Sequence, residues 1–193
     1  MRAWSPSSST LRPMPAPSRG EGSKSRSLWP LPGGVDAYPD TLRVLLEQVR
    51  DGPSLQIAID RLQEAFPQVR SRETARSYLT QVACALGFAQ IRRGRLHLTP
   101  QGRTYLRTGS ATVLRRALRE RVYGVDEILE ALAAGPRRIG LIVSDIANGG
   151  SGWDSNWQIR YRLRWLMGAG LVTRGDGRWP EYRLTKWQAE DSP

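Results

Sequence analysis

Arginine side chains alternate with aromatic and amide side chains in the stretch SNWQIRYRLRW, residues 155 to 165. Arginine pairs with phosphate oxygens or guanine edges, asparagine can bond either, and aromatic faces stack on unpaired or flipped bases. At helical spacing, one side of this stretch collects Asn156, Trp157, Arg160, Tyr161 and Arg164. These residue types in this pattern favour contact with nucleic acid.

A second basic set lies in the middle of the chain. Arg72, Arg76 and Thr80 share one side of a helix that begins near Ser71, and a tight turn with the sequence RRGR follows it. We predict that the helical residues of both sets contact DNA in a groove. We predict phosphate contacts for five arginines in or beside the two hairpin turns, namely Arg92, Arg93, Arg95, Arg174 and Arg178.

The net charge of the whole chain is +11, from 29 basic and 18 acidic residues. Residues 70–107 hold eight Arg and one Glu, and residues 155–186 hold six Arg and one Lys against two acidic residues. These two segments carry +7 and +5, so the rest of the chain sums to −1. Positive charge concentrated on two segments is the electrostatic pattern expected of a nucleic-acid-binding protein.

The elements that would position these residues follow the same order twice. In the first half, two amphipathic helices precede a third whose core stripe is Ala75, Leu79, Val82, Ala83 and Leu86. Gly87 closes that helix, and a hairpin leads to Thr99 and Pro100, which begin another helix. Three helices followed by a hairpin is the order of a winged helix, in which the hairpin is the wing.

The second half also ends in a helix and a hairpin, and the predicted core stripe of its last helix is Ile159, Leu163, Leu166 and Met167. Trp165 falls between the two faces, which suggests a role in the core or in packing between modules. The glycines that close the two third helices, Gly87 and Gly170, lie 83 residues apart. The threonines that close the hairpins, Thr99 and Thr185, lie 86 apart, so the second wing is three residues longer.

The predicted fold class is mainly α with small β-hairpins (α+β), as two tandem winged-helix (helix-turn-helix) domains after a disordered N-terminal tail. Residues 1–38 are Ser- and Pro-rich and basic, which is typical of disorder. The first 20 residues carry Arg2, Arg12 and Arg19 and no acidic residue, which also fits an organelle transit peptide or a start codon placed too early. The expected divisions are a tail at 1–38, winged-helix domains at 39–109 and 110–188, and a C-terminal tail at 189–193.

Several function classes are disfavoured by the sequence. No apolar run is long enough to cross a bilayer, so we expect no membrane role and a cytoplasmic, nucleoid-associated protein. One cysteine, Cys84, and one histidine, His97, provide neither a disulfide nor a Cys/His zinc cluster. Phosphate-binding glycine loops and nucleophile elbows are absent from the sequence, so we expect no catalytic residues, no metal and no cofactor.

The segments LTPQGRTYLRTGS, RVYGVDEILEALAAGP and GWDSNWQIRYRLRWLMGAGLVTR together resemble tandem winged-helix regions of prokaryotic restriction and defence systems, including the modification-dependent restriction type. The resemblance spans about residues 40 to 186. It implies double-stranded DNA as the partner and a restriction or defence setting. The chain departs from that pattern because it carries no ATPase or nuclease domain. It could be a specificity subunit that recruits an effector, or a free-standing transcription regulator.

The sequence therefore predicts a non-catalytic DNA-binding protein, either the DNA-recognition component of a restriction or defence system or a transcription regulator. The alternative is a protein–protein adaptor that docks a nuclease or ATPase effector subunit, or RNA polymerase, through its winged helices. A third hypothesis is that Trp157 and Tyr161 recognise modified or flipped bases.

Overall fold

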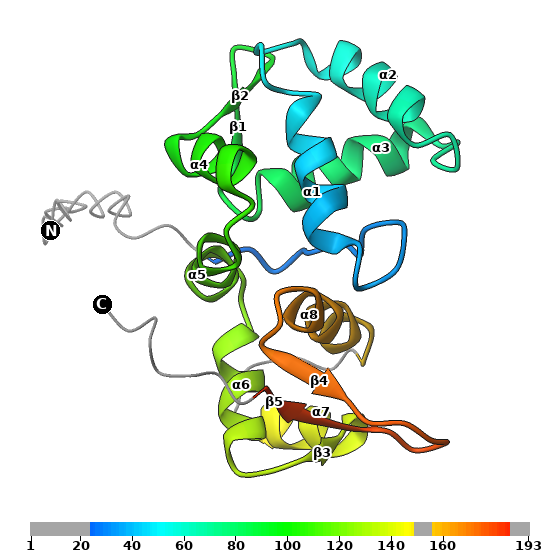
Figure 1. The fold of residues 1–193 in the computed structure, drawn as a ribbon, viewed down its shortest axis with the longest axis vertical. Helices are drawn as coiled ribbons and strands as arrows, with labels where there is room; N and C mark the ends of the chain where they lie inside the picture. The colour runs from blue at the N-terminus through cyan, green and yellow to red at the C-terminus, as the bar shows by residue number, and fades with distance from the viewer. Residues whose placement is uncertain (1–23, 149–155, 186–193) are drawn as a thin grey trace, which may run out of the picture.

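The computed structural model describes residues 24–148 and 156–185. Helices dominate, and the strands form two small antiparallel sheets, so the fold class is α+β as predicted (Figure 1). In the described residues no helix is both long and apolar enough to span a membrane.

The first half of the chain places three helical segments before a hairpin. The third helix continues into a π-helical turn, η1, in which Cys84 donates from its backbone N–H to the carbonyl of Leu79, five residues earlier. An isolated bridge between Ser54 and Arg95 adds the α1–α2 loop to the edge of the hairpin. The elements in order are α1 (Tyr38–Glu47), α2 (Leu55–Ala65), α3 (Arg72–Tyr78), η1 (Leu79–Ala83), β1 (Ala89–Arg92), β2 (Arg95–Leu98) and α4 (Pro100–Thr108).

The second half repeats this order after one additional helix, α5. Its sheet has the strand order β3-β5-β4, so the short strand between α6 and α7 pairs with the returning strand of the hairpin. The elements in order are α5 (Ala111–Arg121), α6 (Val125–Ala133), β3 (Arg137–Arg138), α7 (Ile139–Asn148), α8 (Asn156–Gly168), β4 (Val172–Arg174) and β5 (Glu181–Leu184).

The two third helices end in the same way, as the spacing of the glycines predicts. Gly87 and Gly170 both have positive φ, at 72° and 69°. The residue after each glycine donates to the carbonyl five positions back, Phe88 to Ala83 and Leu171 to Leu166. This is the Schellman pattern, which satisfies the last carbonyls of a helix.

The hairpins also close alike. Thr99 donates from its backbone N–H to the carbonyl of Phe88 at 2.9 Å, and Thr185 donates to that of Leu171 at 3.0 Å. Three more residues separate the second pair than the first, which confirms the longer second hairpin. The first hairpin turns through Arg93 and Gly94, both at positive φ, as a two-residue turn that matches strand twist requires.

Residues 24–37 differ from the expectation of a disordered tail that ends at residue 38. Leu28 and Leu31 are buried, and Ser25 forms a parallel bridge with Val122 at the end of α5. The sequence of this segment has no periodic apolar face, so its burial depends on contacts with residues far along the chain. The part of the predicted tail at 1–23 lies outside the described residues.

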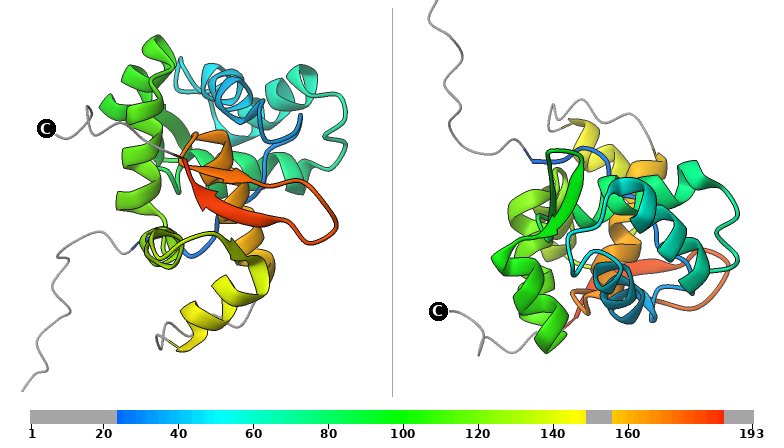
Figure 2. Two further views of the ribbon diagram at one scale, coloured as in Figure 1. Left: turned by 60° about the horizontal axis from the view of Figure 1, so that its bottom comes forward. Right: turned by 90° about the horizontal axis from the view of Figure 1, so that it is seen from above.

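One continuous set of buried side chains extends through both halves of the molecule. Helix α8 lies centrally, next to α1 of the first half, as the two views of Figure 2 show (α8 in orange). The expected division between residues 109 and 110 falls at Gly109, a left-handed residue that ends α4. Segment 24–37 passes between the halves and contacts α8, so the two halves share their packing.

Candidate nucleic-acid interface

The predicted contact residues of helix α3 differ in exposure and in whether they already have a partner in the protein. Ser71 caps the helix by accepting a hydrogen bond from the N–H of Thr74, and Arg72 and Arg76 are both exposed. The Arg72 guanidinium is paired with Asp60 of α2 at 2.6 Å, whereas Arg76 has no ion-pair partner among the described residues. Thr80 is half-buried and donates from Oγ1 to the carbonyl of Arg76 at 2.9 Å. Arg76 is therefore the cation of this helix that is most available to a ligand.

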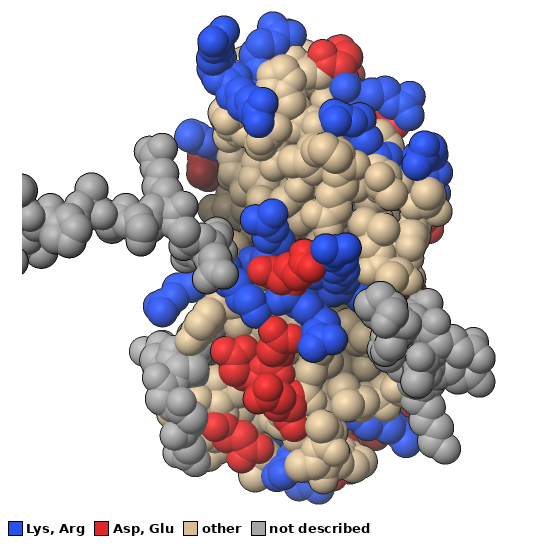
Figure 3. Space-filling model, turned by 90° about the vertical axis from the view of Figure 1, so that its left-hand side faces the viewer, with Lys and Arg blue, Asp and Glu red and all other residues tan. Residues whose placement is uncertain are grey.

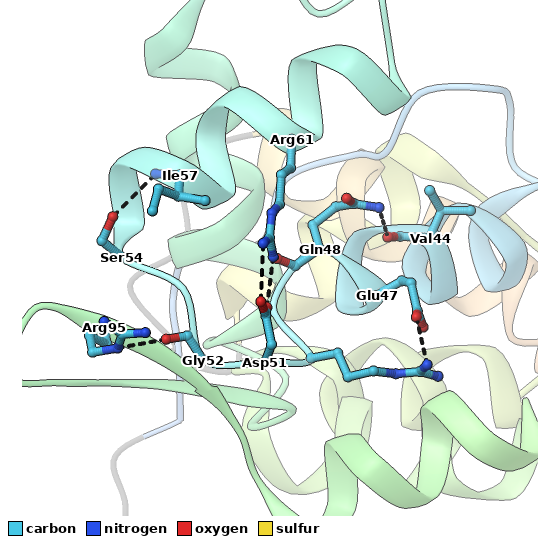
Figure 4. A network of polar contacts seen from close by, with 10 residues as sticks. Val44, Glu47, Gln48, Asp51, Gly52, Ser54, Ile57, Arg61 and Arg95 are labelled. Atoms are coloured by element: carbon cyan, nitrogen blue, oxygen red, sulfur yellow. Dashed lines mark hydrogen bonds and ion pairs between the residues drawn. The ribbon is translucent and has the colours of Figure 1, made fainter.

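The first hairpin carries three exposed arginines at its turn, Arg92, Arg93 and Arg95. The turn conformation places Arg92 and Arg95 opposite each other as a strand pair. Arg95 donates from Nε to the carbonyl of Gly52 at 2.7 Å, which fixes its stem to the α1–α2 loop (Figure 4). The turn is therefore a cationic projection of defined conformation.

A second arginine stabilises the loop that holds Arg95. The guanidinium of Arg61 donates two hydrogen bonds to the Asp51 carboxylate, at 2.7 and 3.0 Å. These bonds join the α1–α2 loop to α2 (Figure 4). The hydrogen bond from Arg61 holds the pKa of Asp51 below its ordinary value of 3.8. Asp51 therefore stays charged at neutral pH.

Helix α8 presents the predicted stripe on one side. Asn156, Arg160 and Arg164 are exposed, Trp157 is 67% exposed, and Tyr161 is half-buried. The rings of Trp157 and Tyr161 lie 6.5 Å apart, tilted by 48°, so they form one aromatic surface. The Arg164 guanidinium lies near the Tyr38 hydroxyl and counteracts the rise in the pKa of Tyr38 that burial causes.

Arg162 and Trp165 show that α8 is also buried on a second side. Ile159, Leu163 and Leu166 are buried as predicted, and Met167 is half-buried. Arg162 is fully buried and donates to the carbonyls of Arg26 and Tyr123, both at 2.7 Å. Arg162 therefore contributes packing to the molecule and no charge to its surface, in contrast to its place in the basic count of residues 155–186.

Trp165, predicted to lie in the core or to pack between modules, is a core residue that lies between the two halves. It is fully buried, its Nε1 donates to the carbonyl of Trp29 at 2.8 Å, and its ring lies 5.0 Å from that of Tyr38 at the start of α1. Burial lowers the pKa of the neighbouring Arg162 guanidinium to about 9, which leaves it charged at neutral pH. Segment 24–37 supplies one carbonyl to each of these two side chains, from Arg26 to Arg162 and from Trp29 to Trp165, and no helical pattern in the sequence signals that role.

The second hairpin carries the predicted Arg174 and Arg178, both exposed. The Arg178 guanidinium lies 5.6 Å from the ring centre of Trp179, and that ring is 68% exposed. Trp179 was not among the predicted contact residues, although an exposed tryptophan beside arginine in a hairpin loop is a signal for one. Asp176 and Glu181 lie in the same hairpin, so its charge is mixed.

Two arginines of α5 lie against the ends of the two third helices. A Cβ built on Gly87 would lie 3.3 Å from Arg121 Nε, and one built on Gly170 would lie 3.3 Å from Arg115 Nη2. Arg115 also donates from Nε to the carbonyl of Ala169 at 2.9 Å. Cations at helix C-termini stabilise the helix dipole, so α5 stabilises both third helices at the same end.

The described residues contain no group of three or more His, Cys, Asp or Glu side chains that could hold a metal ion. Cys84 lies just after η1 and is half-buried, as expected for a residue at the core boundary. Burial raises the pKa of its thiol to about 11. The thiol is therefore protonated at neutral pH and a weak nucleophile.

No protein-family model and no curated protein matches this sequence. A solved structure is similar in fold, with a TM-score of 0.50 and 12% sequence identity over 89% of this chain and 83% of the other. It is the BpuJ1 endonuclease binding domain, crystallised in complex with pyrene- and phenanthrene-modified DNA. Because 89% of this chain is covered, the likeness includes elements of both halves.

Proposed function

We propose that this protein is a non-catalytic DNA-binding protein that uses two winged-helix modules. The observation that carries the proposal is the cationic surface of the first half. Arg76 on α3 and Arg92, Arg93 and Arg95 at the hairpin have no carboxylate partner within ion-pairing distance in the described chain. Four exposed arginines without an ion-pair partner, on a helix and the adjacent hairpin, suit a groove and its flanking phosphates.

The element order supports the assignment of winged-helix modules. Each half has a helix, a short strand or bridge, two further helices and a hairpin, and the first strand or bridge joins the hairpin. In this architecture the third helix enters the major groove and the hairpin lies on the backbone. The third helices here are α3 with η1, and α8.

The two modules have unequal roles in this proposal. In the first, Arg76 reaches base edges or phosphates from α3, with Arg72 and Thr80 beside it, and Arg92, Arg93 and Arg95 hold phosphates. In the second, α8 offers Asn156, Trp157, Arg160, Tyr161 and Arg164, and the hairpin offers Arg174 and Arg178. Because α8 is buried on two sides, only this stripe is left to meet a ligand.

The setting we propose is a restriction or defence system, with transcription regulation as the other DNA-binding role. The similar solved structure is the binding domain of an endonuclease in complex with DNA, which supports DNA as the partner here. A recognition component without catalytic groups of its own would act through a nuclease or ATPase effector subunit. Cytoplasmic, nucleoid-associated localisation is part of the same proposal.

The experiment is a salt series of affinity for duplex DNA. We expect log K to fall linearly with log salt concentration, with a slope of about −0.9 for each phosphate neutralised. Arg76→Ala removes one uncompensated cation from α3. Arg116→Ala removes one exposed cation from α5, where it is paired with Glu120, and is the matched control. Of these two variants, we expect only Arg76→Ala to bind DNA more weakly than the wild type. DNA binding that does not respond to salt would contradict the proposal.

A protein–protein adaptor is the second candidate, and the burial of α8 favours it. The helix that would read DNA in the second module is packed on segment 24–37 and α1, and the hairpin beside it carries acidic as well as basic residues. An adaptor would give weak DNA binding that survives the double change Arg76→Ala and Arg160→Ala. It would also retain a stoichiometric partner, such as an effector subunit or RNA polymerase, in a pull-down of the double variant.

A further inference from the structure

The outer face of the first hairpin forms an open hollow with the start of α4. Its wall includes side chains from both strands, from their turn and from the first turn of the helix, principally Gln90, Arg92, Arg93, Arg95, His97 and Arg103. In Figure 3, Lys and Arg side chains gather at the upper end of the molecule, where this hairpin and α4 lie, and again in a belt at the level of α5. Four of the lining residues are arginines, so the hollow is basic.

Two arginines of the hollow are held in place by backbone carbonyls. Arg95 donates from Nε to the carbonyl of Gly52 at 2.7 Å, and Arg103 donates from Nη1 to the carbonyl of Leu98 at 2.8 Å. A guanidinium has five N–H donors, so each keeps donors for a ligand. Holding the stems in place reduces the side-chain entropy that binding would cost.

The hollow is lined by cationic side chains, and Asp51 of the α1–α2 loop, outside the lining, interacts electrostatically with one of them, Arg95. Four arginines line it and no carboxylate does. No acidic oxygen of residues 24–148 or 156–185 lies within ion-pairing distance of Arg92, Arg93, Arg95 or Arg103. Like charges repel each other where no carboxylate stands between them in the lining, so a bound anion would stabilise this cluster.

The corresponding hollow beside the second hairpin provides an internal comparison. It is lined by Arg138 and Arg183 but also by Asp176 and Glu181, and Arg138 lies 3.9 Å from the Glu181 carboxylate. Two basic and two acidic side chains leave it without net charge. The structure thus distinguishes two hollows at similar places in the fold, of which only the first suits an anion.

We propose that the first hollow binds a backbone phosphate of duplex DNA, with Arg103 as a contact residue beyond those of α3 and the hairpin turn. The inference rests on the proposed DNA binding and adds a phosphodiester contact on the outer side of the hairpin. Arginine forks match phosphate oxygens in two parallel hydrogen bonds, and Arg95 and Arg103 approach the hollow from two elements.

The test compares variants on one random-sequence duplex with 5′-hydroxyl ends, so that only internal phosphodiesters are present. Arg103→Ala should weaken binding about five- to tenfold and reduce the salt slope by about one. Arg107→Ala removes an exposed arginine one turn further along α4, outside the hollow, and Arg183→Ala removes one from the second hollow. Both controls should stay close to the wild type.

Arg103→Gln separates charge from folding, because glutamine keeps an amide donor for the Leu98 carbonyl but lacks the charge. We expect it to lose as much affinity as Arg103→Ala, with a thermal midpoint close to that of the wild type. Wild-type binding with equal affinities for the Arg103 and Arg107 variants would overturn the phosphate site and leave the proposed function standing. Failure of the wild type to bind the duplex at low salt would overturn both.

Discussion

The ring of Trp165 on α8 lies 5.0 Å from the ring of Tyr38 at the start of α1, with both side chains buried. This contact joins the third helix of the second half to the first helix of the first half. A tilted aromatic pair at this distance adds to the free energy gained by burying its area. The two halves are therefore energetically coupled at α8.

Trp165→Ala should destabilise the whole molecule. It removes a large buried side chain and leaves the Trp29 carbonyl without its donor, so we expect a loss of about 3–5 kcal/mol. Trp157→Ala on the exposed side of the same helix should change the free energy of unfolding by less than about 0.5 kcal/mol. Chemical denaturation measures both, and equal effects would contradict the packing of α8 described above.

Leu28→Ala tests whether segment 24–37 is structural. The Leu28 side chain is 1% exposed, so its truncation should cost about 2–5 kcal/mol. Asp36→Ala changes an exposed residue of the same segment and should have little effect. If the Leu28→Ala protein is as stable as the wild type, segment 24–37 is not part of the folded core, as its composition predicts.

Two glycine-to-alanine changes should have opposite signs. At Gly102 in α4, a Cβ would lie 1.9 Å from the carbonyl oxygen of Phe88, so Gly102→Ala must displace the helix from the hairpin and destabilise the fold. At Gly140 in α7, the new Cβ would meet no heavy atom of the described residues within 4 Å beyond its chain neighbours and the backbone of its own helix, so alanine should stabilise the helix by about 0.5–1 kcal/mol. Thermal melts of the two variants would give the signs directly.

The Cys84 thiol should respond to pH in a defined direction. Burial raises its pKa from 9.0 to about 11, so the folded state holds the proton more tightly than the unfolded chain does. Its contribution to stability is complete below pH 9 and is lost as the pH rises from 9 to 11. Native protein should therefore react slowly with a thiol reagent at pH 8, and unfolded protein quickly. Equal rates would show that the thiol is exposed.

Trp157→Ala tests base recognition by α8. The exposed ring beside Tyr161 suits stacking, which contributes about 1–3 kcal/mol per base. We expect the variant to lose any preference for duplexes with modified bases and to keep its general affinity for DNA. Trp179→Ala in the second hairpin is the control of the same residue type, and competition between modified and unmodified duplexes is the measurement. An unchanged preference in Trp157→Ala would exclude the stacking role.

Patterns that depend on neighbours in sequence were predictive. The closing glycines, the Thr99 cap and the apolar stripe of the third helix in the first half all appear as expected, because helix periodicity and turn chemistry are local. The burial of Arg162 could not be predicted, for the opposite reason. Its carbonyl partner Arg26 is 136 residues away, and a basic residue on a helix normally indicates a solvated face.

The candidate site likewise has features that the local sequence predicts and features that depend on contacts between distant residues. Exposure of the arginines at the first hairpin turn follows from the RRGR sequence itself. The hollow beside that turn could not be inferred, because it requires Arg103 of α4 to reach the outer face of β1 and β2. Contacts of this kind arise from packing between helices and strands, which the periodicity of the sequence does not predict.

Helix α5 contacts the C-terminal ends of both third helices at two fixed positions along its length. Arg115 and Arg121 lie six residues apart, which corresponds to a rise of about 9 Å, and each lies against the glycine that ends one third helix. One residue inserted between them would lengthen this spacing by about 1.5 Å and turn one contact by about 100° relative to the other. The number of residues between Arg115 and Arg121 therefore fixes the distance and the rotation between the contacts that α5 makes with the two third helices.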